Sequence, residues 1–233
     1  MVILSSNERK WGRGNTTSTT TLNKVKDALS ARFASTGIRN SGCAVVLSFA
    51  SGSRTVDVVP AFYVGPYKGA VAQYENYPMF SIPDGSGGWL LTSPQIHAAA
   101  LAAEDERSGH KLKRIAQLAK YWAAVRANLN LHSFHAEILT ASAQISIGPR
   151  SYAQGLHELF KNIAARNGRG IQDPLGISGV IPASSGAAAA ARLAVAARTA
   201  ADHAGRAIEA EVQRDTGEAV RQWKIVFGGN FPA

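Results

Sequence analysis

The sequence has a single cysteine and no long apolar segment, and each scarcity excludes a class of protein. Cys43 cannot form an intramolecular disulfide, so the 233-residue chain is not a disulfide-stapled scaffold and suits a reducing compartment. It opens the apolar run 43–47, which predicts a core thiol rather than a nucleophile. The alanine-rich stretch 187–201 is interrupted by Arg192 and Arg198, far from the ~20 apolar residues that a bilayer span needs.

Acidic residues are also scarce. There are 16 Asp and Glu against 25 Lys and Arg, which gives a net charge of +9 and favours a polyanionic partner such as nucleic acid, nucleotides or an anionic membrane surface. Hydrophobic residues at 45% and charged residues at 18% describe a folded chain rather than a disordered one. Because polar residues 5–10 directly follow the short apolar start, we expect no secretory signal and a cytoplasmic location. Because no apolar run is long enough to span a bilayer, we also expect that the chain is not a membrane protein.

The first ninety or so residues are rich in strand patterns. We expect a strand at 2–4, a helix carrying Leu22, Leu29 and Phe33 on one face, and a hairpin of strands 43–49 and 54–60 joined by a turn at 50–53. Residues 61–91 contain many Tyr, Gly and Pro, so we expect an ordered connecting segment there rather than one regular element.

Most of the remaining chain has helical periodicity. We predict helices at 95–106, 110–126, 132–144, 151–166, 185–216 and 218–226. The fold class is therefore α+β, with the strands in residues 1–92 and an all-helical lobe in residues 93–233.

Asp57 is the most informative single residue, because it stands mid-strand among valines. Burying such an acid is costly unless a cation pairs with it. One interpretation is a structural ion pair or an edge-strand carboxylate that faces water. The other is a ligand for Mg²⁺, which prefers carboxylate oxygens and shares its coordination with substrate phosphates.

A second group of polar residues follows one helix. Lys113, Gln117 and Lys120 share a face at four- and three-residue spacing, which is typical of a solvated basic stripe. Lys120 adjoins the bulky pair Tyr121-Trp122, however, and a lysine held by packing could reach a phosphate. His132 and His135 lack a nearby cysteine, which argues against zinc, and the sequence has no Walker-type glycine loop.

Several separated patches together resemble one known family. The segment Val56-Asp57-Val58-Val59-Pro60-Ala61-Phe62 is similar to the third-carboxylate strand of the CD-NTases, nucleotidyltransferases related to cyclic GMP-AMP synthase and oligoadenylate synthase. Four further patches follow in the family's order: Ile82-Pro83-Asp84 with Trp89 and Pro94, Leu118-Ala119-Lys120-Tyr121-Trp122, Ser133-Phe134-His135-Ala136-Glu137, and the tail 223–232.

The resemblance implies a partial nucleotidyltransferase-fold mixed sheet in residues 1–92, a helical nucleotide-binding lobe in residues 93–233, and roles for particular residues. Asp57 matches the carboxylate that binds a catalytic Mg²⁺ or Mn²⁺ ion. Lys120 and Ser133 match groups that contact the triphosphate, and Phe134 matches an aromatic residue that stacks on the base. Relatives often have tyrosine at the position of Phe134, so a hydrogen bond from that hydroxyl is lost here.

The family's Gly-Ser loop and Asp-x-Asp pair do not occur in this sequence, and Met1-Val2-Ile3-Leu4 resembles the strand that follows that pair. A fragment, a truncated gene, a misplaced start codon and a degenerate member are all consistent with this, and we expect the chain to be inactive alone. The implied function is a nucleotidyltransferase that makes cyclic or linear oligonucleotides from nucleoside triphosphates in bacterial antiphage defence, with a nucleic-acid or protein activator. The alternative is a catalytically inactive module that binds nucleotides or RNA.

Overall fold

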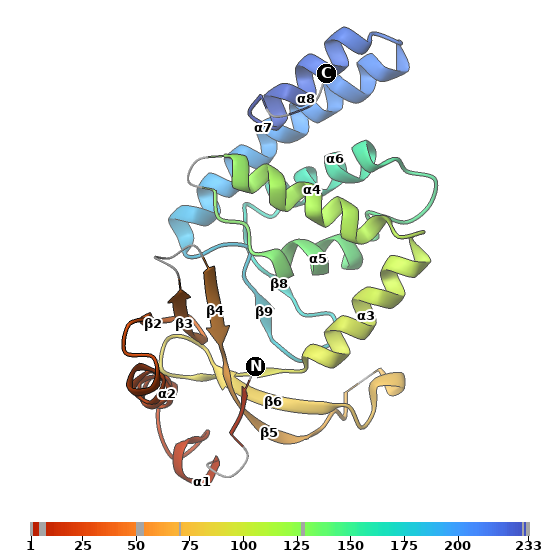
Figure 1. Ribbon diagram of the computed structural model, residues 1–233. Helices are drawn as coiled ribbons and strands as arrows, with labels where there is room; N and C mark the ends of the chain where they lie inside the picture. Colours follow the sequence, from red (N-terminus) through yellow and green to blue (C-terminus); the bar gives the residue numbers. More distant parts are fainter. Residues whose placement is uncertain are drawn as a thin grey trace. The chain divides into compact units, whose positions relative to one another are not determined.

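A computed structural model describes residues 2–4, 8–49, 54–69, 71–126, 129–229 and 231 (Figure 1). The chain divides into two compact units. The first comprises Met1–His97 and Leu175–Ser178, and the second comprises Ala98–Pro174 and Gly179–Ala233. No described helix combines the length and the apolar composition that a membrane crossing requires.

The first unit contains a four-stranded sheet in the order β1-β5-β6-β7, with β1 parallel to β5 and the other pairs antiparallel. Its strands are β1 (Val2–Ile3), β5 (Pro60–Pro66), β6 (Pro78–Pro83) and β7 (Trp89–Thr92). The expectation of a connecting segment at 61–91 is therefore wrong, because this segment supplies most of the sheet. Its prolines stand at the first or last residue of a strand, where the missing N–H disrupts the ladder least.

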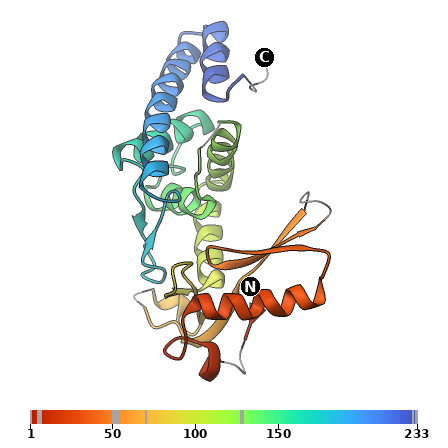
Figure 2. The same cartoon turned by 90° about the vertical axis from the view of Figure 1, so that its left-hand side faces the viewer.

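A three-stranded antiparallel sheet in the order β2-β3-β4 completes the strands of this unit. It consists of β2 (Gly37–Ser41), β3 (Ala44–Phe49) and β4 (Arg54–Val58), and the pairing of β3 with β4 confirms the predicted hairpin. The predicted turn at 50–53 lies outside the described residues. The helix α2 (Ser18–Arg32) packs on β2 and β3, as Figure 2 shows, and the short α1 (Glu8–Trp11) precedes it.

The predicted core position of Cys43 needs correction. Cys43 lies in the turn before β3 and is half-buried rather than buried. Burial raises the pKa of its thiol, and the nearby carboxylate of Asp57 raises it further. The thiol is therefore held in its protonated, less reactive form.

The second unit is helical. It contains α3 (Pro94–Arg107), whose first turn belongs to the first unit, followed by α4 (Lys111–Val125), α5 (Ser133–Ser142), α6 (Tyr152–Ala165), α7 (Ala187–Val212) and α8 (Thr216–Val226). These confirm the predicted helices. The two-residue strands β8 (Ile171–Gln172) and β9 (Val180–Ile181) form a small ladder that periodicity does not reveal.

The core of the second unit lies between α4, α5, α6, α7 and α8. Trp122 and Phe160 meet there with ring centroids 4.7 Å apart, and both are fully buried. On α7 the buried face is mostly alanine, including Ala197, Ala204 and Ala207, so that α6 and α8 approach its backbone closely. This packing fixes the position of α4 and α5, which carry the predicted nucleotide-binding residues.

Candidate nucleotide-binding site

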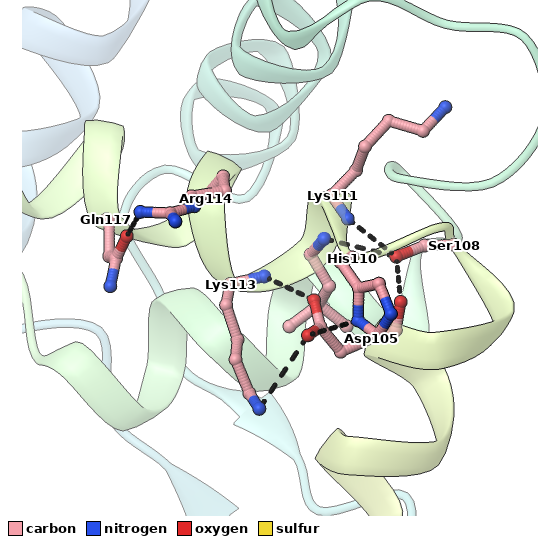
Figure 3. A network of polar contacts seen from close by, with 8 residues as sticks. Asp105, Ser108, His110, Lys111, Lys113, Arg114 and Gln117 are labelled. Atoms are coloured by element: carbon pink, nitrogen blue, oxygen red, sulfur yellow. Dashed lines mark hydrogen bonds and ion pairs between the residues drawn. The ribbon is translucent and has the colours of Figure 1, made fainter.

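The start of α4 is anchored by Asp105 from the end of α3 and by Ser108 from the turn that follows it (Figure 3). The buried carboxylate of Asp105 accepts a hydrogen bond from the backbone N–H of Lys113 at 3.0 Å. The Ser108 hydroxyl accepts bonds from the N–H groups of Lys111 at 3.1 Å and Leu112 at 3.2 Å. Because these N–H groups have no partner inside the helix, the bonds stabilise the first turn of α4.

The three polar residues predicted to share a face of α4 have separate partners in the structure. The Lys113 ammonium lies 3.7 Å from the buried Asp105 carboxylate, as Figure 3 shows. The side-chain oxygen of Gln117 accepts from Arg114 at 3.4 Å. The partner of Lys113 thus belongs to α3, whereas the partner of Lys120 belongs to α5.

Lys120 forms an ion pair with Glu137 of α5. The Lys120 Nζ atom lies 2.8 Å from Glu137 Oε1, and the two side chains are 31% and 29% exposed. Both groups are thus partly shielded from solvent, and the interaction is stronger than that of a fully exposed pair. The sequence motif 133–137 contained Glu137, but its role as the partner of Lys120 was not predicted.

Ser133 and Phe134 form the first turn of α5. Ser133 is exposed, whereas the half-buried Phe134 packs against the core. The residue at the helix N-cap, His132, makes no side-chain cap bond to α5. The N–H groups of this turn carry partial positive charge, which favours an anion such as a phosphate.

His135 lies on the buried side of the same helix. Burial lowers its pKa to about 4, and electrostatic interactions with His132 and Arg166 act in the same direction. Its ring is therefore neutral at pH 7 and belongs to the apolar support of α5 rather than to a charged site.

Asp57 belongs to the first unit, whereas Lys120, Ser133 and Phe134 belong to the second. Asp57 is exposed, lies opposite Val46 of β3, and stands on a strand at the end of the sheet order β2-β3-β4. Its exposure avoids the cost of burying an acid and agrees with an edge-strand carboxylate that faces water. The metal-binding role of Asp57 stays a prediction.

Asp57 can hold a catalytic metal ion only together with other ligand side chains close to it. Within the described residues, no three His, Cys, Asp or Glu side chains gather as a metal-binding group would. Asp84, from the patch 82–84 that resembles the family, accepts hydrogen bonds from the N–H groups of Ser86 at 2.7 Å and Gly88 at 2.9 Å. The Ser86 bond is the main cause of its lowered pKa. The donor set of the described residues thus does not fit a centre of two cations on its own.

No protein-family model and no curated relative matches the chain, but solved structures do. Escherichia coli MS115-1 CdnC, in a complex with HORMA-deltaN, has 20% identity and a TM-score of 0.65; the match covers 100% of this chain and 76% of CdnC. Vibrio cholerae DncV cyclic AMP-GMP synthase, with a linear pppA(3′,5′)pG intermediate, has 12% identity, a TM-score of 0.62 and coverage of 88% and 57%. Elizabethkingia meningoseptica CdnE cyclic dinucleotide synthase, with GTP and Apcpp, has 14% identity, a TM-score of 0.54 and coverage of 81% and 72%.

These similarities show that the chain has the CD-NTase fold. The resemblance seen in the sequence is confirmed at this level, and so is the α+β class. The matched region corresponds to little more than half of DncV and about three quarters of CdnC.

Proposed function

We propose that this chain recognises nucleoside triphosphates as part of a nucleotidyltransferase that joins them into cyclic or linear oligonucleotides and releases pyrophosphate. The observation that carries the proposal is the shared fold, which extends over the whole chain in the comparison with CdnC. Further support comes from the related structures that hold a linear intermediate, GTP or a nucleotide analogue. We include a signalling role in bacterial antiphage defence, as the family resemblance implies.

In this proposal, the second unit binds the nucleotide. The Lys120 ammonium and the Ser133 hydroxyl donate to the triphosphate, and charge-assisted bonds of this kind are among the strongest that proteins make. The first turn of α5 adds N–H groups to the same anion. The accessible part of the Phe134 ring stacks on the base, without the hydroxyl that a tyrosine would add.

Asp57 is the proposed ligand for Mg²⁺ or Mn²⁺. It is a single carboxylate, and two-metal transfer holds its cations about 3.5–4 Å apart with several ligands. The described residues do not supply such a set of ligands. We expect this chain alone to bind nucleotides without joining them.

A nucleic-acid or protein activator also belongs to the proposal. The net charge of +9 attracts polyanions, which supports a nucleic acid. One of the related structures is a complex of CdnC with a HORMA protein, which supports a protein partner.

Two measurements test the proposed function. Calorimetric titration of the chain with ATP and with GTP at fixed salt should give saturable binding that Lys120→Ala weakens. Incubation with all four nucleoside triphosphates and Mg²⁺ or Mn²⁺ should give neither pyrophosphate nor new oligonucleotides. Absence of binding to any nucleoside triphosphate would refute the recognition role, and robust synthesis would show that carboxylates other than Asp57 complete a metal site.

A further inference from the structure

His132 stands directly before the first turn of α5 and is tied to a segment about fifty residues later in the sequence. Its backbone N–H donates to the Ala183 carbonyl at 2.9 Å. Its ring Nδ1 lies 3.1 Å from the Pro182 carbonyl oxygen, and its Nε2 lies 3.1 Å from the Ser185 hydroxyl. Three hydrogen bonds thus join the start of α5 to the segment that leads into α7.

The chemistry of the partners assigns the ring protons. A carbonyl oxygen only accepts, so Nδ1 carries a hydrogen and donates to Pro182. In the neutral ring, Nε2 then accepts from the Ser185 hydroxyl. Both ring nitrogens are therefore engaged by residues 182–185.

The position of His132 is unusual for an N-cap residue. N-cap side chains normally accept a hydrogen bond from the second or third N–H of their own helix. His132 makes no such bond, because its ring nitrogens are engaged with residues 182–185. His132 thus gives its own helix no side-chain cap and instead ties the start of α5 to residues outside the helix.

The two residues that follow are those proposed to contact the nucleotide. Ser133 is exposed, and Phe134 is fixed on one side by the core. A displacement of His132 would change the backbone at Ser133 directly. Misplacement of a binding group by about 1 Å can lower a reaction rate as much as a hundredfold. The hydrogen bonds that hold His132 in place therefore matter for the function of Ser133 and Phe134.

We propose that His132 is a positioning residue that orients Ser133 and Phe134 toward a nucleoside triphosphate by joining the start of α5 to residues 182–185. This inference rests on the proposed function, because it assigns His132 to the same nucleotide site. It adds a residue that acts through its neighbours and does not itself contact the nucleotide.

Substitutions can separate the two ring contacts. His132→Asn places an amide N–H near the position of Nδ1 and should keep the bond to Pro182. His132→Gln reaches toward Ser185 instead, and His132→Ala removes both contacts. We expect His132→Ala to weaken ATP binding about tenfold at unchanged stoichiometry, in keeping with the cost of a misplaced binding group. We expect His132→Asn to recover most of the affinity.

The test compares ATP titrations with thermal melting for each variant. Ser151→Ala is the matched control, because it removes the capping box of α6 and lowers stability without touching α5. The inference holds if His132→Ala loses affinity, His132→Asn restores it, and Ser151→Ala melts lower but binds as the original chain does. It is overturned if His132→Ala binds ATP normally, or if affinity simply follows the melting temperature in all variants.

The same titrations distinguish this inference from the proposed function. If the unmodified chain does not bind ATP, the proposed function fails and the inference fails with it. If the unmodified chain binds ATP and Lys120→Ala weakens that binding while His132→Ala does not, only the role of His132 is refuted.

Discussion

Neutralising Glu137 should tighten nucleotide binding, although Glu137 is the partner of the lysine that we expect to bind phosphate. The Lys120 and Glu137 groups are 2.8 Å apart and about 30% exposed, so water screens them in part. An ammonium has three N–H donors and the bond to Glu137 uses one of them, so Lys120 can contact a phosphate without leaving its partner. The carboxylate would then lie close to a highly charged anion.

Coulomb's law gives the size of the effect. A carboxylate and a phosphate oxygen separated by roughly 5 Å repel each other by about 0.8 kcal/mol at the dielectric constant of water and by about 3 kcal/mol at an effective value of 20. Because the pair is partly exposed, the lower end applies, and Glu137→Gln should tighten ATP binding by about 1 kcal/mol, or roughly fivefold. Loss of the ion pair should cost about 0.5–1 kcal/mol of folding stability.

The assay is calorimetric titration with ATP at low and high salt, for Glu137→Gln, Lys120→Ala and the double variant. Glu158→Gln is the matched control, since Glu158 pairs with Lys161 at 3.0 Å on α6 and its loss changes the net charge equally. Tightening should be specific to position 137, should shrink at high salt and should persist without the Lys120 ammonium. A weakening as large as that of Lys120→Ala would refute the reasoning and show that Glu137 serves mainly to hold the lysine in place.

Three further predictions concern the other residues of interest. Phe134→Ala should weaken ATP binding by roughly 1–3 kcal/mol through lost stacking; because Phe134 also packs against the core, circular-dichroism melting must accompany the titration, and unchanged affinity in a folded variant would leave Phe134 only its core role. Asp57→Asn should reduce Mn²⁺ binding in electron paramagnetic resonance titrations without changing the melting temperature, because Asp57 is exposed; equal Mn²⁺ binding would make this carboxylate structural. The buried His135 has its pKa lowered from 6.5 to about 4, so the unfolded chain binds more protons between these values and stability should fall by up to roughly 3 kcal/mol as the pH drops through this window. Urea unfolding across this range should show a smaller loss in His135→Gln, and an identical loss would contradict the assignment.

Helices were predictable from the sequence because their apolar spacing repeats over three or more turns. The sheet of the first unit was not, because residues 61–91 combine short strands with prolines and glycines that read as irregular. In the structure Pro60, Pro66, Pro78 and Pro83 mark the ends of β5 and β6 and do not interrupt them. The many prolines of this segment therefore indicate where strands begin and end, and they do not argue against the presence of strands.

The candidate site was predictable only where its residues are neighbours in sequence. Ser133 and Phe134 adjoin each other, and Glu137 follows Ser133 by four residues on α5, a spacing that places both on one helix face. That spacing could have pointed to Glu137. The contact of His132 with Pro182 and Ser185 crosses some fifty residues, and local periodicity carries no information about it.

The polar contacts of the site also determine how a nucleotide can bind. Lys120 is hydrogen-bonded to Glu137 of α5, and His132 to Pro182 and Ser185 in the segment before α7. A phosphate that binds Lys120 must therefore share its ammonium with Glu137, whereas nucleotide binding can leave the contacts of His132 unchanged. The contribution of Lys120 to affinity is consequently the attraction between its ammonium and the phosphate less the repulsion between the phosphate and Glu137. It should therefore depend on salt and on the charge at position 137. The contribution of His132 to affinity depends instead on the position of the first turn of α5, which the neutral amide of His132→Asn can restore.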